Sequence, residues 1–326
     1  FPDSFRFPKT DASFTVHPSF SIDRISYTML LFLYYYVFWE SEVFQMKKTV
    51  KFALLGLAAA GALLMAGCGD DKGAAKSAAS GEAQQGQLME TIKKRGKIIV
   101  GTSSGYPPYV FVDSGSADKK VIGLDIEMCQ QIADKLGVKM EVQDMGFSAL
   151  LSSVTAGKVD IAVGGVSPTP EREKVMAFSD KYLPTEQKLL VLKKNQHVYK
   201  TAADLKGKTI GAEKSTTQEA TAQKVEGAKA LGLSSVPDAI LQLKNEKLDG
   251  IVLEGVVAKQ YLIFNDDLAL ADVQFEGAKK VSAVAMKKGN DDLMKIINEI
   301  IKKDTESGQF EKWVDQYSKI AVEKAK

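Results

Sequence analysis

The sequence predicts an α/β protein of two lobes, each a mostly parallel sheet flanked by helices, with two strands that cross between the lobes. Three observations carry this prediction. Short apolar runs alternate with helical patterns through residues 96–167, and the same alternation returns through residues 207–264. Two apolar segments bounded by lysines, 188–195 and 279–289, lie between and after these sets and have the character of crossing strands. Strands that alternate with helices are typical of parallel βαβ units covered on both faces.

The first set begins with an apolar run at residues 96–104 that ends in small polar residues, as a buried strand feeding a loop does. Residues 123–137 place their apolar side chains at helical spacing and end in a glycine, which predicts a helix. Two further strands and one helix complete the set, in the order strand 138–145, helix 147–158 and strand 159–167.

The second set repeats this rhythm. A strand at the start of residues 207–216 leads into a loop. The remaining elements are predicted as helices over 217–232 and 237–247, a strand over 248–256, and a helix over 256–264. Two last helices, 291–306 and 309–318, are expected to pack back on the first lobe.

The segment 46–68 has the layout of an exported protein's leader. Three lysines precede an apolar stretch at residues 52–66, which is short against the roughly 20 residues that a bilayer-spanning helix needs. We therefore favour a signal peptide at 46–67 over a membrane helix. The stretch "LMAGC" resembles a bacterial lipobox, which implies lipid attached to Cys68.

This leader sets the expected domain plan. We expect Met46 to be the start, residues 1–45 to be a spurious or disordered upstream extension, and residues 68–88, which are small and polar, to be a flexible tether. The lobes are then expected as follows: the first lobe at 89–192, the second at 193–282, and a return to the first at 283–326.

Charge and cysteine content exclude several classes. The chain carries 43 Lys and Arg against 41 Asp and Glu, and a neutral chain without a basic run is a poor nucleic-acid binder. Once Cys68 is used, only Cys129 remains, so no internal disulfide forms, and its helical pattern predicts a plain buried cysteine. His197 is the one histidine after the leader, which argues against histidine-dependent nucleophilic catalysis and a His-rich metal site. We expect no cofactor.

Four polar loops follow predicted strand ends and are expected to face a cleft between the lobes, at residues 103–106, 164–172, 213–218 and 254–255. Each has a plainer interpretation. A Gly-Gly pair is often only a tight turn, and an arginine on a first helical turn is usually solvated. The hydroxyls of Ser215, Thr216 and Thr217 are also suited to capping a helix, with Glu219 near the capping-box position.

The combination of loops is more specific than any one of them. Arg172 is suited to two-pronged recognition of a carboxylate, and hydroxyls and free N–H groups at helix starts favour the same anion. Glu254 at a strand end is a partner for an ammonium group, and Tyr106 and Phe147 are placed to wall a side chain. Together these groups predict a site for an α-amino acid zwitterion.

Residues 88–320 resemble the family of bacterial extracellular solute-binding proteins for polar amino acids, the receptors of ABC importers, in a lipoprotein form. The run with T-x-E-R followed by F-S-D is the most specific element. The segments that carry the resemblance are "GTSSGYPPY", "IGLDIEM", "GFSALLSSVTAGKVDIAVGGVSPTPEREKVMAFSDKY", "LKGKTIGAEKSTTQEA" and "KLDGIVLEGVVAKQYL".

The resemblance implies a periplasmic-binding-protein (Venus flytrap) fold that closes on an amino acid, hinges at the crossing strands, and works with a membrane permease and its ATPase. It also implies a monomer that is attached to the membrane only through the lipid on Cys68 and faces the periplasm or the cell exterior.

Carried over by position, the family's site places Arg172 on the ligand carboxylate, helped by the hydroxyl and N–H of Ser167. Thr217 is expected to hold the same carboxylate from the second lobe. The carbonyl of Gly165 and the carboxylate of Glu254 are expected to receive the α-ammonium group. The family usually has Asp where this chain has Glu254, so that contact must shift by one methylene or pass through water.

The side-chain end of the site is implied in the same way. Tyr106 and Phe147 are expected to flank the ligand side chain, and Ser103 stands where many relatives have Asp, which removes a charge. Glu213 occupies a position that in relatives can touch the ligand side chain. If Glu213 points inward, arginine or lysine should bind best, followed by glutamine or another polar amino acid; if it points outward, that preference vanishes.

Two other functions stay open at this point. A few relatives of this family resemble periplasmic cyclohexadienyl (arogenate or prephenate) dehydratases, in which Glu254 and Glu213 are placed to act as acid and base. We favour a binding protein over an enzyme, because the set of Arg172, Ser167 and Glu254 suffices for binding alone. A lipid-anchored adhesion or sensing protein is the other alternative.

Overall fold

The structure is a computed structural model that describes residues 87–324. The expected upstream extension 1–45, the signal peptide 46–67, Cys68 and nearly all of the tether lie outside the described residues. Helix α2 (Gln87–Arg95) begins just before the expected end of the tether at residue 88. No helix within 87–324 is long and apolar enough to cross a bilayer.

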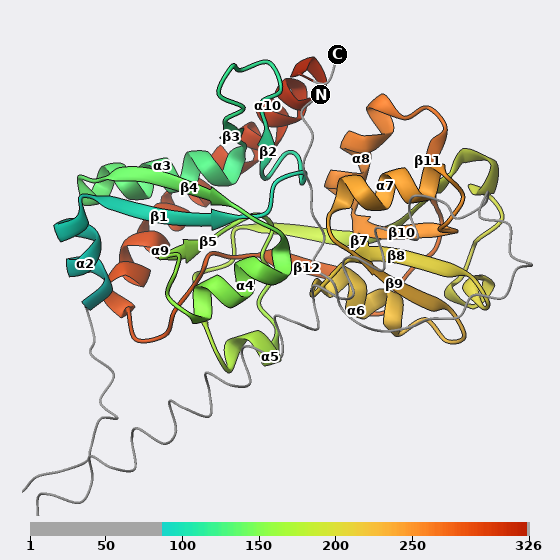
Figure 1. Cartoon of the computed structure of the whole chain (residues 1–326), viewed down its shortest axis with the longest axis horizontal. Coiled ribbons are helices and arrows are strands. Elements are labelled where there is room, and N and C mark those ends of the chain that lie inside the picture. The colour runs from blue at the N-terminus through green and yellow to red at the C-terminus, as the bar shows by residue number, and fades with distance from the viewer. Residues whose placement is uncertain (1–86, 325–326) are drawn as a thin grey trace, which may run out of the picture. The chain divides into compact units, whose positions relative to one another are not determined.

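The first sheet has five strands and lies at one end of the part drawn in colour (Figure 1). β1 pairs in parallel with β4 and β5, whereas β13 joins in an antiparallel direction between β5 and β6. In spatial order the strands are β4 (Lys139–Asp144), β1 (Lys97–Thr102), β5 (Ile161–Ala162), β13 (Ala285–Met286) and β6 (Ala177–Phe178).

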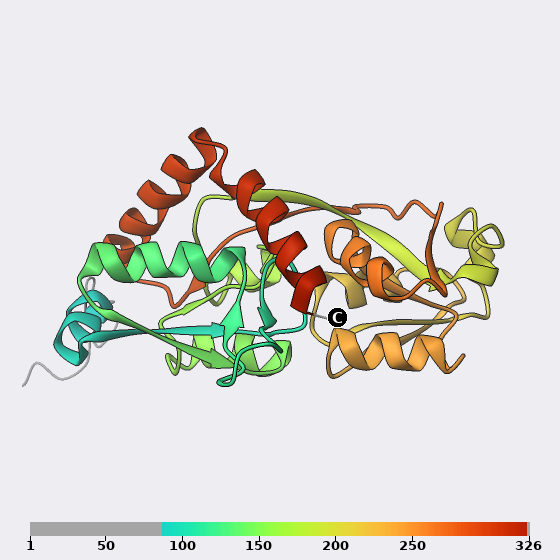
Figure 2. The same cartoon turned by 90° about the horizontal axis from the view of Figure 1, so that it is seen from above.

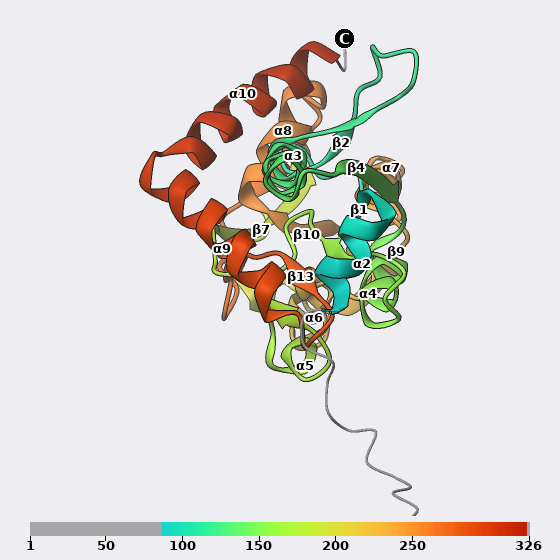
Figure 3. The ribbon, with the colours of Figure 1, turned by 90° about the vertical axis from the view of Figure 1, so that its left-hand side faces the viewer.

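Helices and a hairpin accompany this sheet. α9 packs on α3 and on α2, as the view in Figure 3 shows from the first sheet's side. These elements are α3 (Leu124–Leu136), α4 (Phe147–Thr155), the short α5 (Pro170–Glu173), α9 (Asp291–Glu306) and the β2–β3 hairpin (Phe111–Val112 and Val121–Ile122).

The second sheet repeats the design with mixed strand directions. β8 pairs in parallel with β9 and β10, and β7 pairs antiparallel with β10 and β11. The strands are, in order, β11 (Leu268–Ala271), β7 (Leu183–Leu192), β10 (Gly250–Glu254), β8 (Thr209–Glu213) and β9 (Lys229–Leu233). The helices are α6 (Thr217–Gln223), α7 (Val236–Lys244), α8 (Gly255–Phe264) and the short 3₁₀ turns η1 (Lys193–Asn195) and η2 (Ala202–Leu205).

Two strands link the sheets, as the sequence predicts. β7 runs antiparallel to β12 (Lys279–Ser282) along its first half and to β10 and β11 along its second half. After β12 the chain enters β13 in the first sheet, and Figure 2 shows β7 passing over both sets of elements. β7 begins at Leu183, earlier than the expected segment 188–195. The lobe boundaries expected at residues 192 and 282 remain a prediction.

One predicted helix is wrong. Residues 217–232 were expected to be helical throughout, but α6 ends at Gln223 and β9 follows at Lys229–Leu233. Gly227 adopts a left-handed φ of 71° between them, and β9 satisfies its backbone groups by pairing with β8. Tertiary pairing therefore overrides a weak local helical pattern. The last helix, α10 (Gln309–Lys324), extends beyond the predicted end at residue 318.

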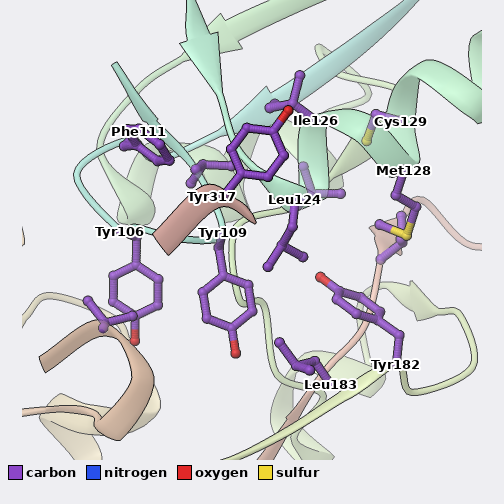
Figure 4. Packing of buried hydrophobic residues seen from close by; sticks show 14 of the residues in the cluster. Tyr106, Tyr109, Phe111, Leu124, Ile126, Met128, Cys129, Tyr182, Leu183 and Tyr317 are labelled. Carbon is purple, nitrogen blue, oxygen red and sulfur yellow. The ribbon is translucent and has the colours of Figure 1, made fainter. Parts of the chain in front are cut away.

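The start of α3 is fixed by close packing against the segment that follows β1. The N–H of Asp125 donates to the carbonyl of Tyr109 at 3.2 Å, and Tyr109 and Leu124 belong to one buried cluster (Figure 4). Gly123 has a φ of 141°, and a Cβ there would lie 2.0 Å from the Tyr109 carbonyl oxygen. Cys129 on the same helix is free and buried, as predicted.

We predict that Gly123→Ala lowers the free energy of unfolding by about 3 kcal/mol, because the methyl group meets backbone that cannot move aside. Gly137→Ala is the matched control: its φ is 68°, but nothing lies within 4 Å of its would-be Cβ, so only about 1 kcal/mol of left-handed strain is expected. Urea unfolding followed by circular dichroism compares the two variants. Equal losses would show that the close approach is not the constraint.

Candidate functional site

A small pocket lies where the ends of β1, β5 and β8 meet the loops that follow them. It contains every predicted binding residue except Glu254. The lining residues are Ser103, Tyr106, Phe147, Gly164, Gly165, Ser167, Arg172, Glu213, Thr216, Thr217, Gln218, Val236, Val252 and Leu253.

Arg172 lies on α5, and the local sequence fixes its place. The Thr169 hydroxyl accepts a hydrogen bond from the Arg172 N–H at 3.3 Å, and Pro170 occupies the first turn, where its missing N–H costs nothing. This cap starts α5 just after the Gly-Gly loop. The Arg172 side chain therefore begins beside that loop, at the pocket.

The guanidinium of Arg172 has polar and aromatic neighbours but no acidic one. It donates to the carbonyl of Ser167 at 2.6 Å and to the carbonyl of Ser215 at 2.9 Å, and it lies 5.2 Å from the centre of the Phe147 ring. Burial lowers the pKa of Arg172 to about 10. None of the ion pairs within residues 87–324 includes Arg172. An anion entering the pocket would therefore meet an uncompensated positive charge.

The Gly-Gly loop is held from behind by a buried carboxylate. Asp125 Oδ2 accepts the N–H of Gly164 at 2.7 Å and that of Gly165 at 3.2 Å, and Asp125 Oδ1 accepts from the Tyr182 hydroxyl at 2.8 Å. Burial raises the pKa of Asp125 to about 6, while these hydrogen bonds oppose the rise. A Cβ on Gly165 would lie 3.0 Å from Tyr106 Cε1, so this loop needs glycine to pass beneath the ring.

The second-lobe loop is a capped helix start, which confirms the plainer interpretation for part of it. Thr216 caps α6 by accepting the N–H of Glu219 at 3.1 Å, and Glu219 reaches back to accept the N–H of Ser215 at 2.7 Å. With the cap supplied by Thr216, the side chain of Thr217 is free to point into the pocket, where it is buried.

Glu213 points inward. It ends β8, lines the pocket with 8% of its surface exposed, and accepts a hydrogen bond from the Ser103 hydroxyl at 3.1 Å. Burial raises the pKa of Glu213 to about 7, and the bond from Ser103 offsets part of that rise. Of the two orientations that the sequence left open, the structure has the one in which the carboxyl group faces the pocket.

Glu254 lies just behind the pocket wall. It ends β10, is fully buried, and its Oε1 lies 3.9 Å from the position of a Cβ on Gly165. Neither carboxylate oxygen has a hydrogen-bond partner within the described part of the chain. Burial raises the pKa of Glu254 to about 8; the nearby Tyr109 and Thr185 hydroxyls oppose this rise, and the negative charge of Asp125 adds to it.

Five direct hydrogen bonds between described residues join the two halves of the site, and one of these joins the hydroxyls of Ser148 and Ser215. Of the other four, Arg172 to Ser215, described above, is one, and the bond from Ser103 to Glu213 is the second. The third runs from Gln218 Nε2 to the Tyr106 hydroxyl at 2.8 Å, and the fourth from the Tyr261 hydroxyl to the carbonyl of Gly105 at 2.8 Å. The lobes therefore meet around the pocket.

Sequence reasoning missed several residues of this wall. Gln218 lies in the loop predicted to face the cleft, yet an uncharged amide gave no reason to single it out. Gly164 and Thr216 belong to predicted loops in the same way. The apolar part of the wall consists of Val236, Val252 and Leu253, which follow core patterns in the sequence.

The groups at this pocket are suited to binding a small polar molecule. The pocket offers one guanidinium, hydroxyls, an amide, two aromatic rings and the Glu213 carboxyl group, and a second carboxyl group of raised pKa, Glu254, lies just behind its wall. Within residues 87–324 no group of three or more His, Cys, Asp or Glu is placed to hold a metal ion.

Comparison with known sequences gives consistent results. The family profile of the bacterial extracellular solute-binding proteins, family 3, matches residues 98–320. The arginine-binding extracellular protein ArtP of Bacillus subtilis (strain 168) is 32% identical over 222 residues, which cover 66% of this chain and 84% of that protein. The L-cystine-binding protein TcyJ of Escherichia coli (strain K12) is 32% identical over 232 residues, which cover 69% and 85%.

Solved structures agree with the architecture. The amino acid ABC transporter substrate-binding protein AbpA of Streptococcus pneumoniae, bound to L-arginine, has a TM-score of 0.69 at 36% identity and covers 72% of this chain and 99% of its own. The P235GK mutant of ArgBP from T. maritima has a TM-score of 0.66 at 31% identity, with 71% and 98% covered. The predicted two-lobed α/β fold is confirmed.

The extent of the match, over both sheets and the loops that line the pocket, identifies a solute-binding protein rather than an enzyme. The chain belongs to the bacterial extracellular solute-binding proteins, family 3.

Proposed function

We propose that this protein is an extracytoplasmic receptor that binds a polar α-amino acid in the pocket, with arginine or lysine preferred and glutamine or another polar amino acid next, and delivers it to an ABC importer. One observation carries the proposal. A guanidinium without an acidic partner and a buried carboxylate without a hydrogen-bond partner lie at the same pocket and come from different lobes. A zwitterion supplies the missing partner to each.

The carboxylate end of the ligand belongs at Arg172. The Ser167 hydroxyl is buried and has no hydrogen-bond partner within residues 87–324, so it is available as a second donor. Thr217 contributes a hydroxyl from the other lobe. Charge-assisted hydrogen bonds of this kind are the strong ones in a partly desolvated pocket.

The ammonium end belongs between the Gly165 carbonyl and Glu254. The Glu254 carboxylate lies next to Gly165, and burial keeps it largely protonated near pH 7 while it has no cationic partner. An ammonium group at hydrogen-bond distance favours the ionised form and lowers that pKa again. The longer Glu side chain, where Asp is usual in the family, brings its carboxylate forward to the loop.

The preference for a basic amino acid rests on Glu213. Its carboxylate faces the pocket, and Phe147 and Tyr106 supply flat walls for an extended side chain. ArtP, which is named as arginine-binding, and AbpA, whose solved structure is bound to L-arginine, support this choice. The cystine-binding TcyJ is the reason to keep other polar amino acids as second candidates.

Closure of the lobes is the proposed signal to the importer. A ligand shifts the balance of open and closed forms only by its differential affinity for them, and a ligand held from both lobes has such a difference. β7 and β12 join the lobes and are the proposed hinge. The permease and ATPase are separate partners, and we propose a monomer held at the membrane by lipid on Cys68.

Arg172→Ala should weaken binding of L-arginine by about 3–5 kcal/mol, because it leaves a desolvated carboxylate without its partner. Isothermal titration calorimetry on the purified protein measures the loss. Lys174→Ala, an exposed lysine just after α5, is the control and should bind as the wild type does. A loss of less than tenfold for Arg172→Ala would show that the carboxylate binds elsewhere.

Affinity should rise with pH between about 6 and 8 and level off above about 8. Glu254, with a pKa near 8 in the free protein, must release its proton to receive an ammonium group, so protons compete with the ligand below that pKa, by up to about tenfold per pH unit. Calorimetry across this range checks the slope. Because Glu213 titrates near pH 7, the effect of Glu254 is tested between pH 7 and 8. In Glu254→Gln the rise of affinity with pH should disappear over this range. If the rise persists, Glu254 does not receive the ammonium group.

Glu213→Gln should weaken L-arginine and L-lysine by about tenfold or more while it changes L-glutamine by less than about threefold, because only a cationic side chain gains from the carboxylate. Thermal-shift ranking of the twenty amino acids, followed by calorimetry on the best three, checks this. A uniform loss for all three amino acids would place the ligand side chain away from Glu213.

A further inference from the structure

A buried glutamine on the strand that crosses between the lobes contacts the pocket without lining it. Gln187 on β7 has 1% of its surface exposed, and its Nε2 donates to Thr217 Oγ1 at 3.0 Å. Its register partner on β10 is Glu254, so both side chains emerge on the same face of the second sheet.

A second hydroxyl contacts the acceptor end of this amide. Thr221 Oγ1 donates to Gln187 Oε1 at 2.5 Å, so the acceptor end of the amide faces Thr221 and the donor end faces Thr217. Both threonines lie on α6, one turn apart. An amide has one acceptor end and one donor end, so with Thr221 on the acceptor end Thr217 meets the donor end.

This orientation decides what the Thr217 hydroxyl can do. Because Thr217 Oγ1 already accepts from Gln187, its own proton must point elsewhere, and here it is donated to Gln218 Oε1 at 3.1 Å. Gln218 Nε2 in turn donates to the Tyr106 hydroxyl at 2.8 Å. The hydrogen bonds thus run in one direction, from Thr221 through Gln187 and Thr217 to the pocket. If the amide were reversed, the Thr217 hydroxyl would donate its proton to Gln187 Oε1.

We propose that Gln187 is a positioning residue for ligand binding: by donating to Thr217 Oγ1 it directs the Thr217 proton away from β7, where a ligand carboxylate can accept it in place of Gln218. This inference rests on the proposed function, since it needs an amino acid whose carboxylate meets Thr217. Gln187 acts only through Thr217.

The position of Gln187 along β7 connects the orientation of Thr217 with the strands that join the lobes. The pairing of β7 changes at this residue, from β12 at Glu186 to β10 at Gln187, and the Gln187 N–H donates to the carbonyl of Ala278 just before β12. The residue that orients Thr217 is therefore part of the linking strands. The orientation of the Thr217 donor is set from the strand that links the lobes.

The test compares an amino acid with its α-carboxamide, which keeps the ammonium group and side chain but loses the anion. The probes are L-arginine and L-argininamide, or, where the thermal-shift ranking favours another amino acid, that amino acid and its carboxamide. Thr221→Val keeps the shape of the side chain and removes the donor that orients Gln187. Calorimetry should show about tenfold weaker binding of the acid and less than about twofold weaker binding of the amide.

Three further variants separate positioning from packing. Thr221→Ser restores the hydroxyl and should bind the acid within about twofold of wild type. Gln187→Leu should lower the preference for acid over amide as Thr221→Val does. Tyr199→Phe, which removes a buried hydroxyl bonded to Asp249 in the same lobe, is the control and should leave that preference unchanged.

The outcomes are distinct. Equal weakening of acid and amide, or an unchanged preference in both Thr221→Val and Gln187→Leu, overturns the positioning role and leaves the proposed function standing. A wild-type protein that binds none of the twenty amino acids overturns the proposed function and this inference with it.

Discussion

The site depends on two ionisable groups that are buried without their natural partners. Burial lowers the pKa of Arg172 and raises that of Glu254, so burial disfavours the charged form at both groups. Removing either charge from water is costly unless a counter-charge or hydrogen bonds replace the lost solvent. A single small zwitterion supplies both counter-charges at once, which favours it over a simple anion or a simple cation.

The rest of the structure keeps these two groups at one pocket. Asp125 accepts the N–H groups of Gly164 and Gly165, which holds Gly165 next to Glu254, and the Thr169 cap starts α5 so that the Arg172 guanidinium lies over Phe147. In the second lobe the Thr216 cap leaves Thr217 free for the pocket. Each arrangement needs only a few hydrogen bonds, so the two sheets can set the positions of the loops while the loops supply the chemistry.

Much of the fold and of the candidate site was predictable from the sequence, and the physical reasons differ between the two. The strand and helix rhythm, the crossing strands and the polar loops follow from apolar periodicity, which tertiary structure rarely overrides in buried elements. β9 was missed because an edge strand is defined by its pairing with β8 and not by its own pattern. The sequence could not predict the orientation of Glu213, because a side chain at a strand end can point either toward the pocket or away from it. Gln187 and Gln218 were missed because an uncharged amide acquires a role only through neighbours that are distant in sequence.

The energetics of closure follow from the kinds of contact that cross between the lobes. Two of the direct contacts, the Tyr261 hydroxyl on the Gly105 carbonyl and Gln218 on the Tyr106 hydroxyl, are neutral hydrogen bonds, each worth about 1 kcal/mol net. The bonds from Arg172 to Ser215 and from Ser103 to Glu213 each include an ionisable group. Reversing a two-state balance from 1:99 to 99:1 takes about 5.5 kcal/mol. Hydrogen bonds to charged groups contribute about 1.5–3 kcal/mol each, so two or three of them made to the ligand only in the closed form reach that value. Under the proposed function, the contacts between the lobes give the closed form its geometry, and the charges of the ligand decide when it forms.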